Sequence, residues 1–530
     1  MSATILDEPT RTDHVHPAAS SSPSTALSLR LVMMLVVIRL LLPLLTRARI
    51  WEFHRDEFLY FAMADHFDLW HMQFPPMIAL IAGAGRLVFG DSVLAARVPA
   101  AIGGAALTAV ILLLIRRLGG GSRAAILATL ALLAAPVFVR TSLLMHPVIF
   151  DQLWSTMALA ALTLAAHERA PRWWIGVGVA LGLGALTKFS IAFVGLSVVV
   201  AVALNAELRT QLRSRWPWFA VIVGAAMSAP SVLGQITHHW PFLQQMQALS
   251  SGQLKQVSAA TFLANQPLLL ASASLCVIAG FAASIRGPAR DRVPVSAAVA
   301  MITLMLLLHG KGYYAAPVYP VVIAIGALQL ERLSAARPWI APVAATFMLG
   351  CAIIVWPLGV PVFAPSTMIR YAASLGSAET VKTNRGELLQ LPQDYADMLS
   401  WRALADSVGA VVARLPAEQR RDLTIIGSNY GQAGALAFYS RRTRIPYPRS
   451  TAGDFWAWGP GPGSGNNVIV VGSSAEIGDA LRQLYESVEE VRVIANPLGV
   501  PEEQRVTIYH ARGARAQLAS VWPTLGPNWE

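Results

Sequence analysis

The sequence predicts a polytopic α-helical membrane protein of about eleven spans, followed by a smaller α/β domain outside the membrane. Hydrophobic residues make up 55% of the 530 residues and charged residues only 13%, against roughly 25% charged residues in soluble proteins. The imbalance is regional: residues 1–369 carry 25 Lys/Arg and 14 Asp/Glu, whereas residues 370–530 carry 16 of each. An apolar, basic part followed by a balanced part excludes a chain of soluble domains.

The apolar runs define the predicted membrane part, residues 27–365. An apolar helix needs about 20 residues to cross a bilayer. Candidate spans, several of them short, occur near 27–46, 92–115, 124–139, 149–166, 173–187, 189–206, 217–236, 266–285, 293–309, 314–330 and 338–359. Residues 1–26 are rich in Ser, Pro and Ala, which predicts a disordered tail.

The distribution of the arginines predicts how the protein is oriented in the membrane. Five loops, at 116–123, 167–172, 207–215, 286–292 and 331–337, together hold thirteen arginines. Loops with an excess of Lys and Arg stay in the cytoplasm, so the N-terminus is predicted to be cytoplasmic and the part after the eleventh span extracytoplasmic. Scattered clusters of this kind do not form the continuous basic stripe that a nucleic-acid-binding protein presents.

The last third, residues 366–530, alternates strand and helix patterns. The run LTIIGS (423–428) precedes a helical stretch, and NNVIVVG (466–472) precedes AEIGDALRQLYESV, another helical stretch, which EVRVIAN follows. This order predicts a small α/β domain with a parallel sheet. The glycine-rich GPGPGSG (459–465) precedes a strand instead of following one, so we interpret it as a loop and not as a phosphate-binding motif.

The first outer connection, residues 47–91, concentrates polar residues among aromatic ones. Apolar positions recur at helical spacing, which predicts a helix lying along the membrane interface; Pro75–Pro76 ends it, and 77–89 forms a second interfacial helix. Asp56 and Glu57 are adjacent, so on a helix their side chains point about 100° apart. A carboxylate at the membrane surface with cations nearby suits a general base beside a phosphate leaving group.

Other ionisable residues are predicted on the same outer side. Asp151 stands at the outer end of the fourth span, and Lys188 lies between two apolar runs; an ionisable group beside a span marks a functional site by default, although a lysine can also snorkel to the interface. Histidines near carboxylates could also bind a divalent metal, with His54, His66 and Glu57 as candidate ligands.

The run from 54 to 104 resembles the N-terminal signature of the GT-C membrane glycosyltransferases. It is similar in particular to the protein O-mannosyltransferase-like and lipid A aminoarabinose-transferase-like group of glycosyltransferase family 39. The resemblance rests on four features: an acidic pair after the first span, a Pro-Pro about twenty residues later, a Phe-Gly, and an Arg and a Pro separated by one hydrophobic residue. In this sequence they are Asp56–Glu57, Pro75–Pro76, Phe89–Gly90 and Arg97-Val98-Pro99. The blocks around Asp151, Lys188 and 311–327 are similar to later blocks, so the resemblance covers roughly residues 50–330.

The resemblance implies an inverting transferase that takes a sugar from a polyprenyl-phosphate donor on the extracytoplasmic side. By position, Asp56 corresponds to the base that deprotonates the acceptor, with Glu57 as its partner and Asp151 as a second acidic residue. The donor-phosphate candidates are Lys188 first, then Arg97 and Lys311. The acceptor stays open among protein, lipid and cell-envelope glycan, and so does the sugar.

Other functional classes stay open in the sequence. A polytopic transporter or lipid flippase is the main alternative, although such proteins usually show internal repeats, and none is visible here. A docking protein that displays the last third outside would leave the acidic first loop unexplained. A lipid-linked phosphoethanolamine or phosphate transferase would need a metal-rich soluble domain, but residues 366–530 contain one histidine, His510.

Overall fold

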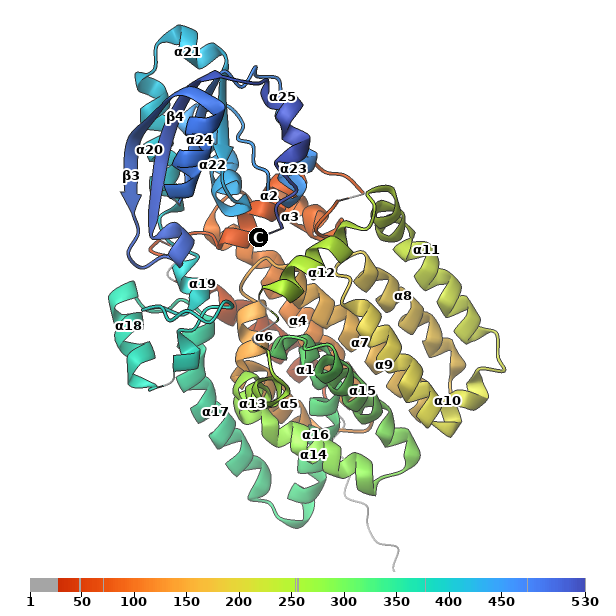
Figure 1. Cartoon of the computed structure of the whole chain (residues 1–530). Helices are drawn as coiled ribbons and strands as arrows, with labels where there is room; N and C mark the ends of the chain where they lie inside the picture. Colours follow the sequence, from red (N-terminus) through yellow and green to blue (C-terminus); the bar gives the residue numbers. More distant parts are fainter. Residues whose placement is uncertain are drawn as a thin grey trace, which may run out of the picture.

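The computed structural model describes residues 27–529 except 47–48, 70, 253, 255–256, 377 and 474. The tail predicted over residues 1–26 lies outside these residues. Figure 1 shows a layered bundle of long helices with a small sheet domain seated on one end of it. This arrangement confirms the predicted fold class.

The apolar runs form the bundle, and each of the eleven predicted segments coincides with one or two of its helices. These helices are α1 (Leu29–Leu41), α4 (Val93–Arg117), α5 (Ser122–Ala134), α6 (Pro136–Thr141), α7 (Pro147–His167), α8 (Trp174–Ala185), α9 (Ile191–Leu204), α11 (Trp216–Thr237), α13 (Ala259–Leu270), α14 (Ser274–Arg286), α15 (Val293–Leu307), α16 (Tyr319–Ala336) and α17 (Ile340–Gly359). The break between α5 and α6 follows from Pro136, which has no backbone N–H to donate to the preceding turn.

Within the described residues, six helical stretches are at least 18 residues long and apolar enough to cross a membrane: 93–117, 147–167, 216–237, 259–286, 312–336 and 340–359. Other predicted spans, such as α8 and α9, are shorter helices. The most enclosed of these helices is α7, in which 89% of an 18-residue apolar stretch is buried inside the protein. A polar side chain on α7 therefore faces protein and not lipid.

The first outer connection contains the two predicted helices, α2 (Arg55–Asp65) and α3 (Met77–Phe89), which are separated by Pro75 and Pro76. Two short helices, α10 (Ala206–Gln211) and α12 (Pro241–Ser251), connect longer ones. A row of aromatic side chains on α2 is completely buried, including Phe58 and Tyr60. This burial makes α2 part of the core between the bundle and the sheet domain.

The C-terminal part contains a mixed sheet, whereas the sequence predicted a parallel one. The strands are β1 (Leu423–Gly427), β2 (Asn467–Gly472), β3 (Tyr485–Ala495) and β4 (Arg505–Ala514); the described residues form one sheet in the order β1-β2-β4-β3. Strands β1 and β2 are parallel, but β4 runs antiparallel to both of its neighbours. The predicted helix over 475–488 ends at Leu484, because the following residues pair with β4.

The helices of the C-terminal part cover this sheet and connect it to the bundle. They are α18 (Pro365–Ser374), α19 (Gln393–Ala396), α20 (Trp401–Arg414), α21 (Ala417–Arg421), α22 (Tyr430–Thr443), α23 (Gly453–Ala457), α24 (Ala475–Leu484) and α25 (Leu518–Val521). Apolar side chains of α2, α3, α20, α22, β1 and β2 form one continuous core. The sheet domain is therefore packed directly onto the first outer connection.

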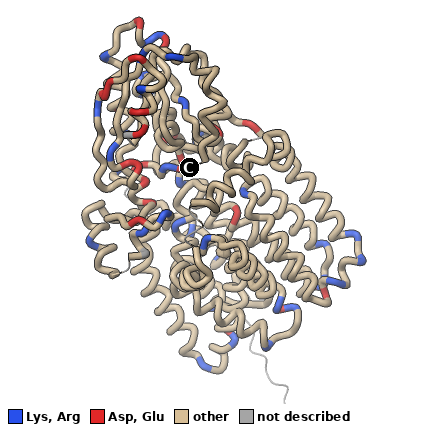
Figure 2. The backbone as a smooth tube through the Cα atoms, viewed as in Figure 1, with Lys and Arg blue, Asp and Glu red and all other residues tan. Residues whose placement is uncertain are grey.

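The charged residues divide the molecule into two ends. Figure 2 shows basic segments at the turns of the helical bundle farthest from the sheet domain, and mixed charges around the sheet domain and its junction with the bundle. The arginine-rich connections around α10, between α14 and α15, and between α16 and α17 lie at the far end (Figure 1). This clustering at one end agrees with the prediction that the arginine-rich loops lie on one side of the membrane.

Candidate active site

The start of α2 places Asp56 and Glu57 at the junction of bundle and sheet domain. His54 is the N-cap, and its Nδ1 accepts a hydrogen bond from the backbone N–H of Asp56 over 3.2 Å. Glu57 closes a capping box: one carboxylate oxygen accepts from the N–H of His54 (2.8 Å) and the other from the N–H of Met145 (3.0 Å). Both oxygens of the buried Glu57 thus bind backbone groups, and Glu57 fixes the loops around Asp56.

Each carboxylate oxygen of Asp56 faces a donor from another part of the chain. The hydroxyl of Tyr430 donates to Oδ1 over 2.8 Å, and Nε2 of His146 lies 3.4 Å from Oδ2. Nδ1 of His146 accepts the backbone N–H of Val148 at the start of α7. In neutral His146 the hydrogen is therefore on Nε2, which points it toward Asp56.

The electrostatic setting keeps Asp56 ionised. Burial alone would raise the pKa of Asp56, but the hydrogen bond from His146 and the positive charges around it, including Arg55, hold that pKa well below its usual range. Burial lowers the pKa of His146, and its hydrogen bond to Asp56 only partly opposes this. Asp56 is accordingly a carboxylate over the whole physiological pH range.

Lys188 and Lys311 form a basic group close to Asp56. The Nζ of Lys188 lies 5.1 Å from the ring centroid of Tyr314 and 5.6 Å from that of Tyr313, which are cation–π distances. Burial lowers the pKa of Lys311; Tyr314 and Asp56 oppose this lowering, and the charge of Lys188 adds to it. Lys311 therefore interacts electrostatically with both Lys188 and Asp56, and Lys188 interacts with His146, the neighbour of Asp56.

Asp151 lies on the enclosed helix α7, five residues after the His146 cap. The hydroxyl of Ser190 donates to its Oδ2 over 3.0 Å, and its buried Oδ1 has no hydrogen-bond partner within the described part of the chain. Lys188 lies within electrostatic reach of it. The structure thus places Asp151 beside the lysine group rather than in contact with Asp56.

Arg97, a predicted phosphate ligand, occupies a different position. Its completely buried guanidinium donates to the hydroxyl of Thr46 (3.0 Å) and the carbonyl of Glu52 (3.3 Å) and contacts the sulfur of Met398. These contacts use Arg97 inside the protein, where it links α4 to the chain leading into α2. The structure does not bring Arg97 together with Lys188 and Lys311.

The three residues considered for a metal do not form a site. His54 and His66 stand at opposite ends of α2, about 18 Å apart at 1.5 Å per residue. His66 stacks on Trp458 with a centroid separation of 4.4 Å, and Glu57 binds two backbone N–H groups. Among the described residues, no group of three His, Cys, Asp or Glu side chains could hold a metal ion.

Several residues around Asp56 were not predicted. His146 had a usable signal, since it is a polar residue at the outer end of the span that contains Asp151. Arg55, next to Asp56, contacts Asp397 (Nε to Oδ1, 3.5 Å), forms a 2.8 Å ion pair with Glu502 and lies over the ring of Tyr430. Its partners come from the C-terminal part, and no local pattern in the sequence connects them to α2.

A polar cavity of about 900 Å³ opens beside Asp56, between α2, α12 and the C-terminal part. Amide and hydroxyl side chains contribute much of its wall, together with aromatic rings. Representative lining residues are Gln73, Gln245, Asn384, Asn429, Tyr430 and Trp529. A cavity with this lining can bind a hydroxyl-rich molecule next to the Asp56 carboxylate.

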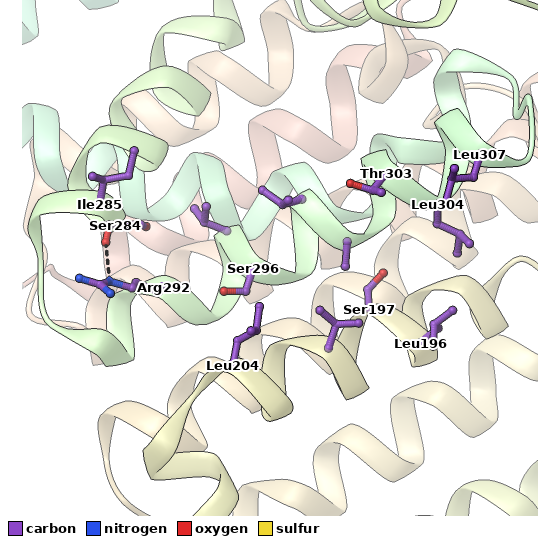
Figure 3. Close-up of a pocket in the computed structure, with 14 residues that line it drawn as sticks. Leu196, Ser197, Leu204, Ser284, Ile285, Arg292, Ser296, Thr303, Leu304 and Leu307 are labelled. Atoms are coloured by element: carbon purple, nitrogen blue, oxygen red, sulfur yellow. Dashed lines mark hydrogen bonds between the residues drawn. The ribbon is translucent and has the colours of Figure 1, made fainter. Parts of the chain in front are cut away.

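An apolar groove of about 780 Å³ runs between α9, α14 and α15 (Figure 3). Apolar side chains, chiefly leucine and valine, line most of it, and Arg292, which donates to the carbonyl of Ser284, stands at one end. Helix α9 begins three residues after Lys188, and α15 ends four residues before Lys311. The opposite end of the groove, near Leu307, is therefore the end closer to the two lysines.

Comparisons with known proteins agree with this architecture. Residues 73–233 match the family model described as dolichyl-phosphate-mannose-protein mannosyltransferase; this range contains Asp151 and Lys188 but begins after Asp56. No curated protein sequence matches the chain. The crystal structure of ArnT from Cupriavidus metallidurans bound to undecaprenyl phosphate is similar, with a TM-score of 0.60, 16% identity, and coverage of 91% of this chain and 97% of that one.

The apo structure of the same ArnT gives a TM-score of 0.58, again with 16% identity and coverage of 91% and 97%. A match over 91% of 530 residues reaches beyond the membrane part into the C-terminal sheet domain. The family-model match and the similarity in fold confirm the resemblance drawn from the sequence. The chain therefore shares the fold of these ArnT structures and has the long apolar helices of a multi-pass membrane protein.

Proposed function

We propose that this protein is an inverting glycosyltransferase that moves a sugar from a polyprenyl-phosphate donor to a hydroxyl of an extracytoplasmic acceptor. The observation that carries the proposal is the position of Asp56. It is an ionised carboxylate with a polar cavity on one side and the basic group of Lys188 and Lys311 nearby. A transferase that joins a polar acceptor to a lipid-linked donor needs these three elements together.

The proposed chemistry is a single displacement. The acceptor hydroxyl in the cavity attacks the anomeric carbon, the bond from this carbon to the phosphate oxygen breaks, and Asp56 takes the hydroxyl proton. A carboxylate of low pKa is a weak base, but it suffices here because the attacking oxygen becomes strongly acidic as its new bond forms. Lys188 and Lys311 would stabilise the charge that develops on the leaving phosphate.

The donor assignment rests on charge and on the groove. A phosphate held by the two lysines would sit near the end of the apolar groove between α9 and α15. We propose that the polyprenyl chain of the donor lies in this groove, in contact with its leucine and valine side chains. The bound undecaprenyl phosphate in the similar ArnT structure supports this class of lipid. Asp151, beside Lys188, is the second acidic residue of the proposed site.

The orientation and the domain division are part of the proposal. The arginine-rich loops would face the cytoplasm together with the N-terminus, and the sheet domain would be extracytoplasmic. We divide the chain into the membrane domain, residues 27–365, and the C-terminal domain, residues 366–530. A reporter fused after Glu530 should be extracytoplasmic and one inserted at 209–215 cytoplasmic; a cytoplasmic reporter after Glu530 would contradict the placement of Asp56.

The release of polyprenyl phosphate tests the function directly. Membranes containing the protein are incubated with a polyprenyl-phosphate sugar labelled in both the lipid and the sugar. We expect free polyprenyl phosphate to appear together with labelled sugar on a non-lipid or new lipid product. Movement of the intact donor across the membrane without cleavage would instead indicate a transporter or flippase.

A further inference from the structure

Tyr430 joins the C-terminal domain to the proposed base. It is the first residue of α22, and its hydroxyl donates to Oδ1 of Asp56, 374 positions away in the sequence, over 2.8 Å. We propose that Tyr430 is a positioning residue for the transfer reaction: the C-terminal domain uses it to hold the Asp56 carboxylate in its working orientation. This inference rests on the proposed function.

The packing of α22 on α2 fixes where the hydroxyl of Tyr430 can lie. A Cβ atom added at Gly434 would meet the backbone and Cβ of Phe58 at 2.8–3.1 Å, and one added at Gly431 would meet the side chain of Arg55 at 2.4 Å. Only glycine permits this close approach at both positions. The two helices therefore meet closely, in a register that brings Tyr430 over Asp56.

The first turn of α22 is held from its other side as well. The side chain of Asn429 accepts the N–H of Gln432 (2.9 Å), and both Asn429 and Gln432 donate amide hydrogens to the buried carboxyl group of Glu503. The guanidinium of Arg55 lies over the Tyr430 ring, with its carbon 5.4 Å from the ring centroid. The phenol ring thus has little freedom to swing away.

The two donors on Asp56 have a geometric consequence. Tyr430 binds Oδ1 and His146 approaches Oδ2, so rotation of the carboxylate about its last side-chain bond would break one contact or both. Each carboxylate oxygen can accept a second hydrogen bond, which leaves room for an acceptor hydroxyl from the cavity that Tyr430 also lines. Burial and the negative charge of Asp56 raise the pKa of Tyr430, so the phenol stays a donor.

The test compares purified Tyr430→Phe, which lacks only the hydroxyl, with Tyr439→Phe on the same helix. Tyr439 lies nine residues farther along α22, which is about 14 Å at 1.5 Å per residue. We expect kcat for polyprenyl-phosphate release to fall about 10-fold in Tyr430→Phe, with the KM for the donor and the melting temperature unchanged. Tyr439→Phe should keep the wild-type kcat.

Two further variants separate the possible failures. Tyr430→Gln keeps an N–H donor and should recover part of the lost kcat, whereas a role in packing alone would make Phe the better replacement. Equal kcat in Tyr430→Phe and Tyr439→Phe, or a loss that only follows the melting temperature, would overturn the positioning role. Asp56→Asn is run in parallel: if it stays active, or the wild type releases no polyprenyl phosphate, the proposed function itself fails.

Discussion

The two ends of the helical bundle use the same charged residue types in opposite ways. At the end far from the sheet domain, Arg169 pairs with Glu207 over 3.3 Å while 77% of its side chain is exposed. At the end that carries the sheet domain, Arg55 and Asp397 are 3.5 Å apart and the side chain of Asp397 is only 1% exposed.

Stability alone does not explain the second arrangement. Burying ions costs several kcal/mol per group unless their partners compensate, and at the sheet-domain end the compensation is incomplete. Buried atoms such as Oδ1 of Asp151 and Oδ2 of Asp394 have no hydrogen-bond partner within the described part of the chain. The contrast teaches that the charges at the far end pair on the surface, whereas buried charges mark the region where we place the chemistry.

Apart from the proposed base Asp56, Lys188 is the residue whose substitution should reduce activity most, and a substitution at the far end should not have this effect. Lys188→Ala removes a charge from the proposed phosphate site, and a contact with a charged group contributes about 1.5–3 kcal/mol. We expect kcat/KM for the lipid-linked donor to fall about 100-fold, with little change in melting temperature. Arg213→Ala at the far end is the matched control; an equal effect in both variants would show that Lys188 is a general surface cation.

A pH dependence of stability should belong to the sheet-domain end. Burial raises the pKa of Glu503 from about 4.5 to about 7, despite hydrogen bonds from Asn429 and Gln432 that favour the charged form. The folded protein therefore keeps this proton where the unfolded chain has lost it, so stability falls as pH rises from about 4.5 to 7.

Between pH 5 and pH 8 the contribution of Glu503 amounts to about 2 kcal/mol. Melting curves across this range should show the decline in the wild type and a flatter profile in Glu503→Gln, which cannot titrate. A wild-type profile that rises with pH, or an unchanged slope in the variant, would show that Glu503 is charged in the folded protein.

The smallest effect is expected at the far end. Arg169→Ala removes an exposed ion pair with Glu207, and such pairs contribute about 0–1 kcal/mol. The release of polyprenyl phosphate should match the wild type, and the melting temperature should change by no more than about 2 °C. A large loss of activity would erase the proposed difference between the two ends and call for a functional site among the arginine-rich loops.

The helices were the most predictable part of this molecule. Each apolar run formed a helix or a pair of helices, and Pro75–Pro76 separated α2 from α3 as expected, because these signals are local. The sheet was less predictable: β4 and most of β3 depend on pairing with each other, and β3 is an exposed edge whose sequence lacks a strong alternation. The prediction of a parallel sheet was wrong for this reason.

The candidate site was predictable only in part, for the same physical cause. Asp56, Asp151, Lys188 and Lys311 could be selected because charged residues near apolar runs are unusual. Arg97 satisfies the same criterion but is used for packing between α4 and α2. Tyr430 had no signal of its own, since its meaning arises when α22 folds back onto α2 across 374 positions.

The most direct test of the central claim is Asp56→Asn in the polyprenyl-phosphate release assay. The amide keeps the size of the side chain but has no useful proton affinity, so it cannot act as a base. We expect the variant to fold, to bind the lipid-linked sugar as the wild type does, and to lose transfer by at least about 100-fold. Retention of more than about a tenth of the wild-type turnover would contradict the assignment of Asp56 as the base.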